Sequence, residues 1–66
     1  MYLKIVRCTD PLKWYYHMVG KVVPLLAIEE TEYKSREPAG YVNFVSKDDA
    51  VVEGESGEQY LGGYYQ

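Results

Sequence analysis

Few side chains in this sequence of 66 residues have the types and the spacing that metal binding or nucleophilic catalysis requires. His17 is the only histidine and Cys8 the only cysteine, whereas a zinc site takes several such ligands at recognisable spacing. The serines Ser35, Ser46 and Ser56 lie in no nucleophile motif, and no glycine-rich phosphate loop precedes a helix. We therefore expect neither a metal site nor a cofactor.

Adjacent acids are the other candidate chemistry, because paired carboxylates can act as general acid and general base. Glu29 and Glu30 are one pair, and Asp48 and Asp49 are the other. Neighbouring residues of a strand point to opposite faces, so such a pair cannot share a substrate proton; we expect the second pair to begin a turn. Cys8 has no base beside it and is expected to be buried at a strand end. The sequence predicts that the protein is not an enzyme.

An aromatic run, Trp14-Tyr15-Tyr16, is the strongest candidate for a partner-binding surface. The chain has eight tyrosines, more than so small an interior can bury, so we expect part of the run at the surface, with Tyr41 extending it. Aromatic side chains supply large contact area at low entropic cost, which suits an interface. The alternative is that Trp14 lies in the core and that only one tyrosine of the run is exposed.

Charge is unevenly distributed along the chain. Residues 1–22 hold four Lys or Arg and one acid, whereas residues 23–66 hold three Lys or Arg and nine acids. A nucleic-acid reader usually has a basic footprint, and the pI here is about 4.9, so nucleic acid is not the expected partner. The aromatic run beside the basic half leaves stacking on single strands or small ligands as an alternative. The acidic half either meets a basic partner surface or is a solvated face.

The C-terminal segment, residues 54–66, is acidic and rich in tyrosine. Gly54-Glu55-Ser56-Gly57 predicts a break, and Tyr60, Tyr64 and Tyr65 follow it. Tyrosines so closely spaced suit an interface. We expect this tail to dock on its own domain, on a second copy as an added strand, or on a partner protein; a flexible end is the alternative.

Composition and punctuation predict an all-β fold. Tyr, Val and Ile fit a pleated surface, and six glycines and three prolines recur at the spacing of short strands and turns. Alternation in the first strand places Leu3 and Ile5 on one face, with Tyr2, Lys4 and Val6 on the other. We expect five strands, at residues 2–8, 21–28, 33–37, 41–45 and 50–53.

The first connection is long. It begins with a turn at residues 9–11, where Asp10 can cap a neighbouring amide. Residues 12–19 form either a helical turn or an irregular aromatic loop, which Gly20 ends. The strand at 21–28 is apolar on both faces and is expected to be central or wrapped, although Pro24 prefers an edge or a bulge.

The last two strands are joined by residues 46–49. We expect a single helical or 3₁₀ turn there, with Ser46 as its cap. In the strand before it, Val42 and Phe44 are expected to face the core, and Tyr41 and Asn43 the opposite side.

Five short strands, a long first loop and a helical turn before the last strand resemble the SH3-like small barrel. More specifically, the chain looks similar to short uncharacterised proteins of Gram-positive bacteria and their phages. The residues that carry this resemblance are Trp14-Tyr15, Gly20-Lys21, the run from Arg36 to Val45, and Lys47 to Ala50. The resemblance covers residues 1–53, where it implies an SH3-like five-stranded barrel and no activity; the tail at 54–66 departs from it.

Size and composition also limit the cellular setting. A chain this short buries a small core, so a homo-oligomer is a reasonable expectation. The lone cysteine and the lack of a long apolar stretch predict a cytoplasmic protein without membrane contact. We expect a non-catalytic protein-binding module, such as a phage-encoded inhibitor or modulator of a host defence protein that acts by stoichiometric binding. The alternatives are an aromatic ligand or single-strand binder and a structural homo-oligomer.

Overall fold

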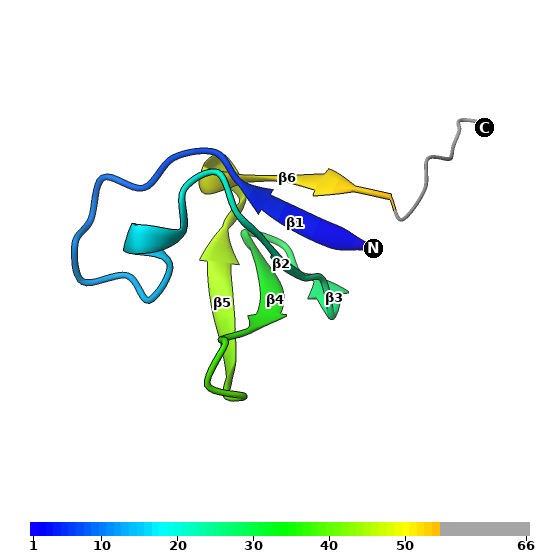
Figure 1. The fold of residues 1–66 in the computed structure, drawn as a ribbon. Helices are drawn as coiled ribbons and strands as arrows, with labels where there is room; N and C mark the ends of the chain where they lie inside the picture. Colours follow the sequence, from blue (N-terminus) through cyan, green and yellow to red (C-terminus); the bar gives the residue numbers. More distant parts are fainter. Residues whose placement is uncertain (55–66) are drawn as a thin grey trace.

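The computed structural model describes residues 1–54, which form an all-β domain with two 3₁₀ turns (Figure 1). In chain order the elements are β1 (Tyr2–Ile5), η1 (Tyr16–Met18), β2 (Val22–Pro24), β3 (Ala27–Ile28), β4 (Glu32–Arg36), β5 (Val42–Ser46), η2 (Lys47–Asp49) and β6 (Ala50–Glu53). Within this range no helix is long and apolar enough to cross a membrane. The predicted all-β class is confirmed, and the predicted tail lies outside the described residues.

The strands pair as two antiparallel sheets, ordered β2-β1-β6 and β3-β4-β5 (Figure 1). Over residues 1–54 the hydrogen-bonded ladders leave these sheets separate and do not close into one barrel. There are six strands where five were predicted, because the segment 21–28 breaks after Pro24 and gives β2 to one sheet and β3 to the other. Both pieces are edge strands, so of the two predicted alternatives, central or wrapped, the central position is excluded, and Pro24 lies at an edge as its preference indicated. An edge is where a proline, which has no N–H, fits a sheet.

The core lies between the two sheets and is small. In β1, Leu3 and Ile5 are fully buried while Tyr2 and Lys4 are exposed, as the alternation predicted. The side chains of the buried apolar core are Leu3, Ile5, Tyr15, Val23, Val45 and Ala50. Ala50 begins β6, whose bounds match the predicted last strand.

The facing of β5 is the reverse of the prediction. Val42 and Phe44 are 46% and 40% exposed, whereas Val45 is fully buried. In the ladder Val45 lies opposite Tyr33, and Asn43 lies opposite Ser35, which is itself fully buried. The odd-numbered residues of β5 therefore face the core, and Phe44 is left on the outer face.

Local turns follow the sequence closely. The main chain of Gly20 has φ +89° after η1, and that of Gly40 has φ +104° in the turn before β5; this region favours glycine. Residues 12–19 prove to be an irregular loop that contains one 3₁₀ turn. The predicted 3₁₀ turn before the last strand is η2, but the side chain of Ser46 makes no capping hydrogen bond.

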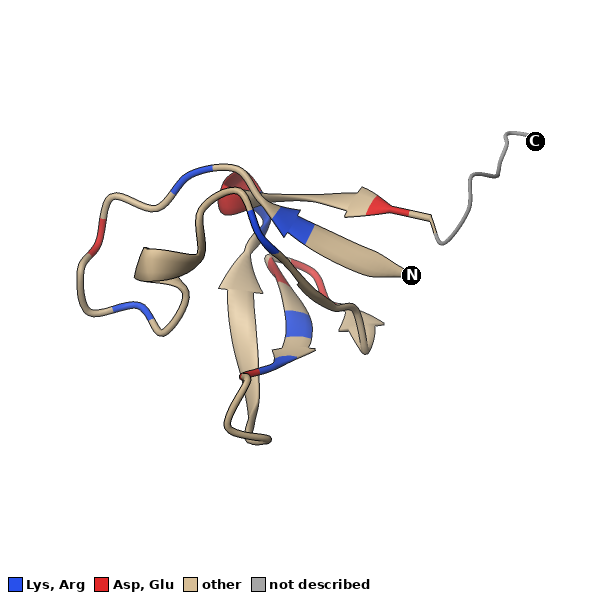
Figure 2. Ribbon diagram, in the orientation of Figure 1, with Lys and Arg blue, Asp and Glu red and all other residues tan. Residues whose placement is uncertain are grey.

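The fold brings the oppositely charged halves of the chain together. Figure 2 shows Lys and Arg on β1 and on the long loop that precedes η1, and acids at η2 and at the end of β6. Arg7 of the loop forms an ion pair with Asp49 of η2, with Nε 3.5 Å from Oδ1. The main chain of Asp49 accepts hydrogen bonds from the N–H groups of Val6 and Arg7. The start of the long loop is thus fixed to η2.

Candidate functional site

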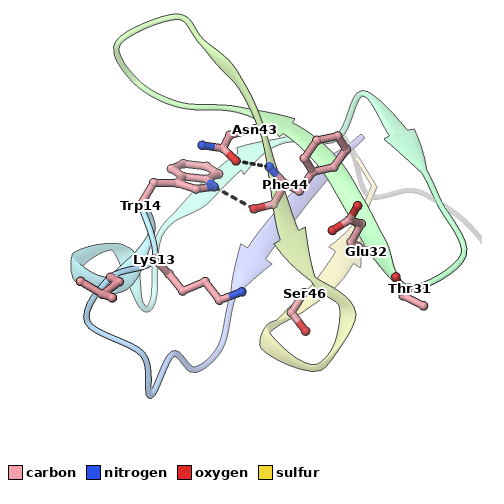
Figure 3. A pocket seen from close by; sticks show the side chains of 8 residues that line it. Lys13, Trp14, Thr31, Glu32, Asn43, Phe44 and Ser46 are labelled. Atoms are coloured by element: carbon pink, nitrogen blue, oxygen red, sulfur yellow. Dashed lines mark hydrogen bonds between the residues drawn. The ribbon is translucent and has the colours of Figure 1, made fainter.

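A groove of about 540 Å³ lies between the long first loop and the outer side of β5 (Figure 3). Three apolar and five polar or charged residues line it: Leu12, Lys13, Trp14, Thr31, Glu32, Asn43, Phe44 and Ser46. They come from the loop, from the turn before β4, from the first residue of β4, and from β5. Segments distant in sequence therefore converge on one concave surface.

Trp14 is fixed in place at the loop side of the groove. Its indole Nε1 donates a hydrogen bond of 2.8 Å to the carbonyl oxygen of Phe44. Its ring packs edge-on against Tyr15, with the ring centroids 5.5 Å apart, and it lies partly buried against the core. Figure 3 shows the indole beside β5 on the loop side, and the Phe44 ring projecting from β5 on the side away from the indole. Trp14 therefore forms one wall of the groove, and these contacts hold its indole ring in one orientation.

Tyr15 anchors the same loop from the inside. Its side chain is fully buried, and its hydroxyl donates a 2.6 Å hydrogen bond to Oδ2 of Asp49. The same hydroxyl accepts a hydrogen bond from the backbone N–H of Ser46 at 3.2 Å. Burial, and secondarily the hydrogen bond to the Asp49 carboxylate, raise the pKa of Tyr15 to about 12. The loop is therefore attached to both β5 and η2 through one phenol group.

Leu12 is the most exposed large apolar side chain of the described residues, at 92%. The turn that presents it is fixed by Asp10, whose side-chain Oδ1 accepts from the Leu12 N–H at 2.9 Å and whose carbonyl accepts from the Lys13 N–H at 3.1 Å. This confirms the predicted capping by Asp10. The fixed turn therefore presents the Leu12 side chain at the groove, next to Lys13 and Trp14.

The β5 side of the groove is also fixed by local bonds. Asn43 accepts a hydrogen bond from the Phe44 N–H on its Oδ1 at 2.8 Å, and its Nδ2 donates to Oε2 of Glu37 at 2.7 Å. These two bonds fix the Asn43 amide between its own strand and the preceding turn. Lys13 and Glu32 place opposite charges on the lining, so the groove offers hydrogen-bonding groups of both polarities.

The predicted aromatic surface is only partly assembled. Trp14 lines the groove, whereas Tyr15 belongs to the core, so it is unavailable at the surface and the prediction that placed it there does not match the structure. Tyr16 is 36% exposed and packs edge-on against His17 with centroids 5.0 Å apart, outside the groove lining. Tyr41 is 71% exposed in the turn before β5 and does not line the groove either. The predicted binding residues Tyr60, Tyr64 and Tyr65 lie outside the described residues.

Most groove residues were not predicted. Phe44 was assigned to the core, so its place on the outer face was missed. Leu12 had a usable signal, because an apolar residue directly after an Asp-Pro turn is presented at the surface. The polar residues Thr31 and Glu32 had no sequence signal that marks them as groove residues, because only the pairing of β4 with β5 brings them beside the loop.

No group of three His, Cys, Asp or Glu residues in the described part of the chain is placed to hold a metal ion. Cys8 is partly buried in the long loop, three residues after β1 ends, and not buried at a strand end as expected; its Sγ lies 3.4 Å from the carbonyl oxygen of Asp10. Comparison of the chain with protein-family models, with curated proteins and with solved structures finds no match. The function is therefore argued from the geometry of the groove.

Proposed function

We propose that the chain is a non-catalytic protein-binding module that holds an extended segment of a partner protein in the groove between the long loop and β5. One observation carries this proposal: a groove of about 540 Å³ has exposed apolar groups, Leu12 and Phe44, around a fixed Trp14. Protein interfaces combine such aromatic and aliphatic anchors with a polar rim. Here the rim is supplied by Lys13 and Glu32.

An SH3-like small barrel, of the kind found in short proteins of Gram-positive bacteria and their phages, is the fold we assign with this function. Three features support the assignment. The segment 21–28 contributes to both sheets, a long loop joins β1 to β2, and the 3₁₀ turn η2 directly precedes β6. By this analogy the partner is a host protein, such as a defence protein, and the action is stoichiometric inhibition or modulation.

A stacking platform for small ligands or single-stranded nucleic acid has less support. Such a platform needs several aromatic faces open to solvent. Of the predicted run, Tyr15 is buried and Trp14 is half-buried, with its indole N–H bonded to the main chain of β5. The acidic pI of about 4.9 also works against a phosphate backbone.

A matched pair of surface variants tests the proposal. Leu12 and Ile28 are both strongly exposed aliphatic residues, but only Leu12 lines the groove. Full-length wild type, Leu12→Gln and Ile28→Gln are used as baits in a lysate of a Gram-positive bacterium, and captured proteins are identified by mass spectrometry. We expect one protein to be held by wild type and by Ile28→Gln and to be lost by Leu12→Gln.

The binding is then characterised by the fluorescence of Trp14, the only tryptophan. A partner segment in the groove should shift the Trp14 emission and tolerate moderate salt, because the anchors are apolar. Equal capture by Leu12→Gln and wild type would overturn the assignment of the groove. Capture of nucleic acid alone, with quenching of Trp14 that is lost steeply as salt rises, would support the stacking platform instead.

A further inference from the structure

Each three-stranded sheet has two outer edges, formed by β2 and β6 in one sheet and by β3 and β5 in the other. An open strand edge presents a row of N–H and C=O groups to which another strand can pair. The four edges of this domain differ in how far their outward groups are occupied, and that difference singles out β6.

The β5 edge is closed by side chains. The carbonyl oxygen of Phe44 accepts from Nε1 of Trp14 at 2.8 Å, and the N–H of Phe44 donates to Oδ1 of Asn43 at 2.8 Å. Two residues further along β5, the N–H of Ser46 donates to the hydroxyl of Tyr15 at 3.2 Å. Two side chains of the long loop and one of β5 itself therefore occupy outward groups of Phe44 and Ser46 that an incoming strand would need.

The β2 and β3 edges offer little to a pairing strand. Pro24 of β2 has no N–H, and its carbonyl oxygen accepts a 2.7 Å hydrogen bond from Oγ of Ser35. β3 consists of only two residues, Ala27 and Ile28. Short strands and prolines are common means of protecting a sheet edge.

The β6 edge has neither kind of protection. The N–H of Ile5 donates to the carbonyl oxygen of Lys21, and its C=O accepts from the N–H of Gly20, so both groups point toward the β2 side. Because Ile5 makes these bonds on that side, its ladder partner Ala50 directs its own backbone groups away from β1. By the same alternation the outward groups of β6 include those of Val52. Within residues 1–54 no donor or acceptor reaches the outward groups of Ala50 and Val52.

We propose that β6 pairs antiparallel with β6 of a second copy, around a two-fold axis at Val52, so that two three-stranded sheets become one six-stranded sheet. In this register Val52 lies opposite its own equivalent, and Val51 lies opposite Glu53 of the second copy. The outward N–H and C=O groups of the two Val52 residues bond each other.

Charge and burial favour a second copy as the occupant. On the outer face Val51 lies beside Lys4 in the β1–β6 ladder. In the proposed pairing, Glu53 of the second copy lies on the other side of Val51, so one strand separates its carboxylate from the Lys4 ammonium. The two-fold axis gives the second copy the same arrangement. No like charges lie directly opposite each other in the pairing. Val52 packs partly buried against the core, and residues 1–54 bury only six apolar side chains, so placing Val52 beside its equivalent adds apolar contact next to a small core.

A proline at position 52 tests the pairing in the full-length chain. Val52→Pro removes the outward N–H without removing a bond to β1, and Val52→Ala shortens the side chain but keeps the N–H. Sedimentation equilibrium over a concentration series is expected to show dimers for wild type and for Val52→Ala. For Val52→Pro the dimer Kd should rise about tenfold or more, since two symmetric hydrogen bonds are lost. Trp14 emission reports whether each variant is folded.

A cross-link gives an independent reading if the proline variant does not fold. In a Cys8→Ser background, Val52→Cys should form a disulfide-linked dimer on oxidation, because hydrogen-bonded pairs have Cα atoms about 5.5 Å apart. Val22→Cys, on the opposite edge of the same sheet, should not. The proposal is overturned if the wild-type protein stays monomeric at every concentration. This holds also if residues 55–66 or a strand of another protein prove to cover β6. A Val52→Pro variant that dimerises like wild type overturns it as well.

Discussion

Tyr15→Phe isolates the phenol group that attaches the long loop to the rest of the domain. The substitution keeps the buried ring and removes only the hydroxyl. That hydroxyl donates to Oδ2 of Asp49 at 2.6 Å and accepts from the N–H of Ser46 at 3.2 Å. Both partners are partly buried, so water replaces the lost bonds incompletely.

The two lost contacts set the size of the effect. A hydrogen bond to a charged acceptor contributes about 1.5–3 kcal/mol, and a partly buried N–H left without a partner costs about 1 kcal/mol or more. We expect Tyr15→Phe to lower the free energy of unfolding by about 2–4 kcal/mol. For a domain of this size, with a urea m-value of about 1 kcal/mol/M, the midpoint of unfolding falls by about 2 M or more.

Burial and, secondarily, the hydrogen bond to Asp49 raise the pKa of Tyr15, so the folded environment of this phenol has a signature in pH. The phenol has a pKa of about 12 in the folded protein against 10.0 for an unperturbed tyrosine. Between these values the folded state keeps a proton that the unfolded state releases, so stability falls as pH rises. The contribution is complete below pH 10 and is lost as pH approaches 12, and two pKa units correspond to at most about 2.7 kcal/mol.

Urea unfolding followed by Trp14 emission measures both effects. Tyr16→Phe is the matched control: its hydroxyl makes no hydrogen bond to any residue of 1–54, and the substitution should change stability by less than about 0.5 kcal/mol. The gap in unfolding free energy between wild type and Tyr15→Phe should be full at pH 8 and should narrow between pH 10 and 12, because the two proteins differ only in this phenol group. A Tyr15→Phe variant as stable as Tyr16→Phe, or a gap that does not change with pH, would refute the assigned role.

Two further substitutions test the turn and the core. Gly40→Ala should lower the free energy of unfolding by about 1–2 kcal/mol, because φ is +104° at this position. An added Cβ would meet no atom within 4 Å, so the loss comes from backbone strain alone, and an unchanged Tm would contradict it. Ser35→Ala should lower the free energy of unfolding in urea by about 1–2 kcal/mol, since it leaves the carbonyl of Pro24 without its 2.7 Å donor. Ser46→Ala removes no side-chain hydrogen bond within residues 1–54 and should be nearly neutral; equal losses for the two variants would show that the Ser35 bond contributes little.

Features set by neighbouring residues were predictable from the sequence. The alternation of β1, the Asp10 turn, the 3₁₀ turn before β6 and the strand at Ala50–Glu53 all follow from local patterns. In each case the physical cause lies within a few residues: period-two burial, a side chain that reaches its own backbone, or a short strand after a turn. Such causes do not depend on which distant strand lies alongside.

The facing of β5 was not predictable, because both of its faces carry apolar residues. Phe44 and Val42 form one set, and Val45 belongs to the other. The choice is made by pairing with β4, where buried Ser35 lies opposite Asn43, and by Tyr15, whose hydroxyl bonds to the β5 main chain. Both causes are long-range, so the outer position of Phe44, and with it the groove, could not be read from local pattern.

The aromatic run shows the same limit at a finer scale. Three consecutive aromatic residues occupy three environments: Trp14 lines the groove, Tyr15 is in the core and Tyr16 lies at the surface. The irregular loop has no helical or strand period, so spacing does not specify which residue turns inward. The size of the interior did predict that all three could not be buried.

The same hydrogen bonds close the β5 edge and shape the groove. Binding can therefore be tested separately from folding only at groove residues that do not make these bonds. Trp14 and Tyr15 each bond the β5 main chain, so changes at these positions remove edge protection, loop position and groove wall together. Leu12 and Phe44 present apolar surface to the groove, and the side chain of Leu12 is almost fully exposed. A loss of partner binding at Leu12 without a loss of stability therefore identifies the groove as the binding surface, whereas a loss at Trp14 would not separate the two.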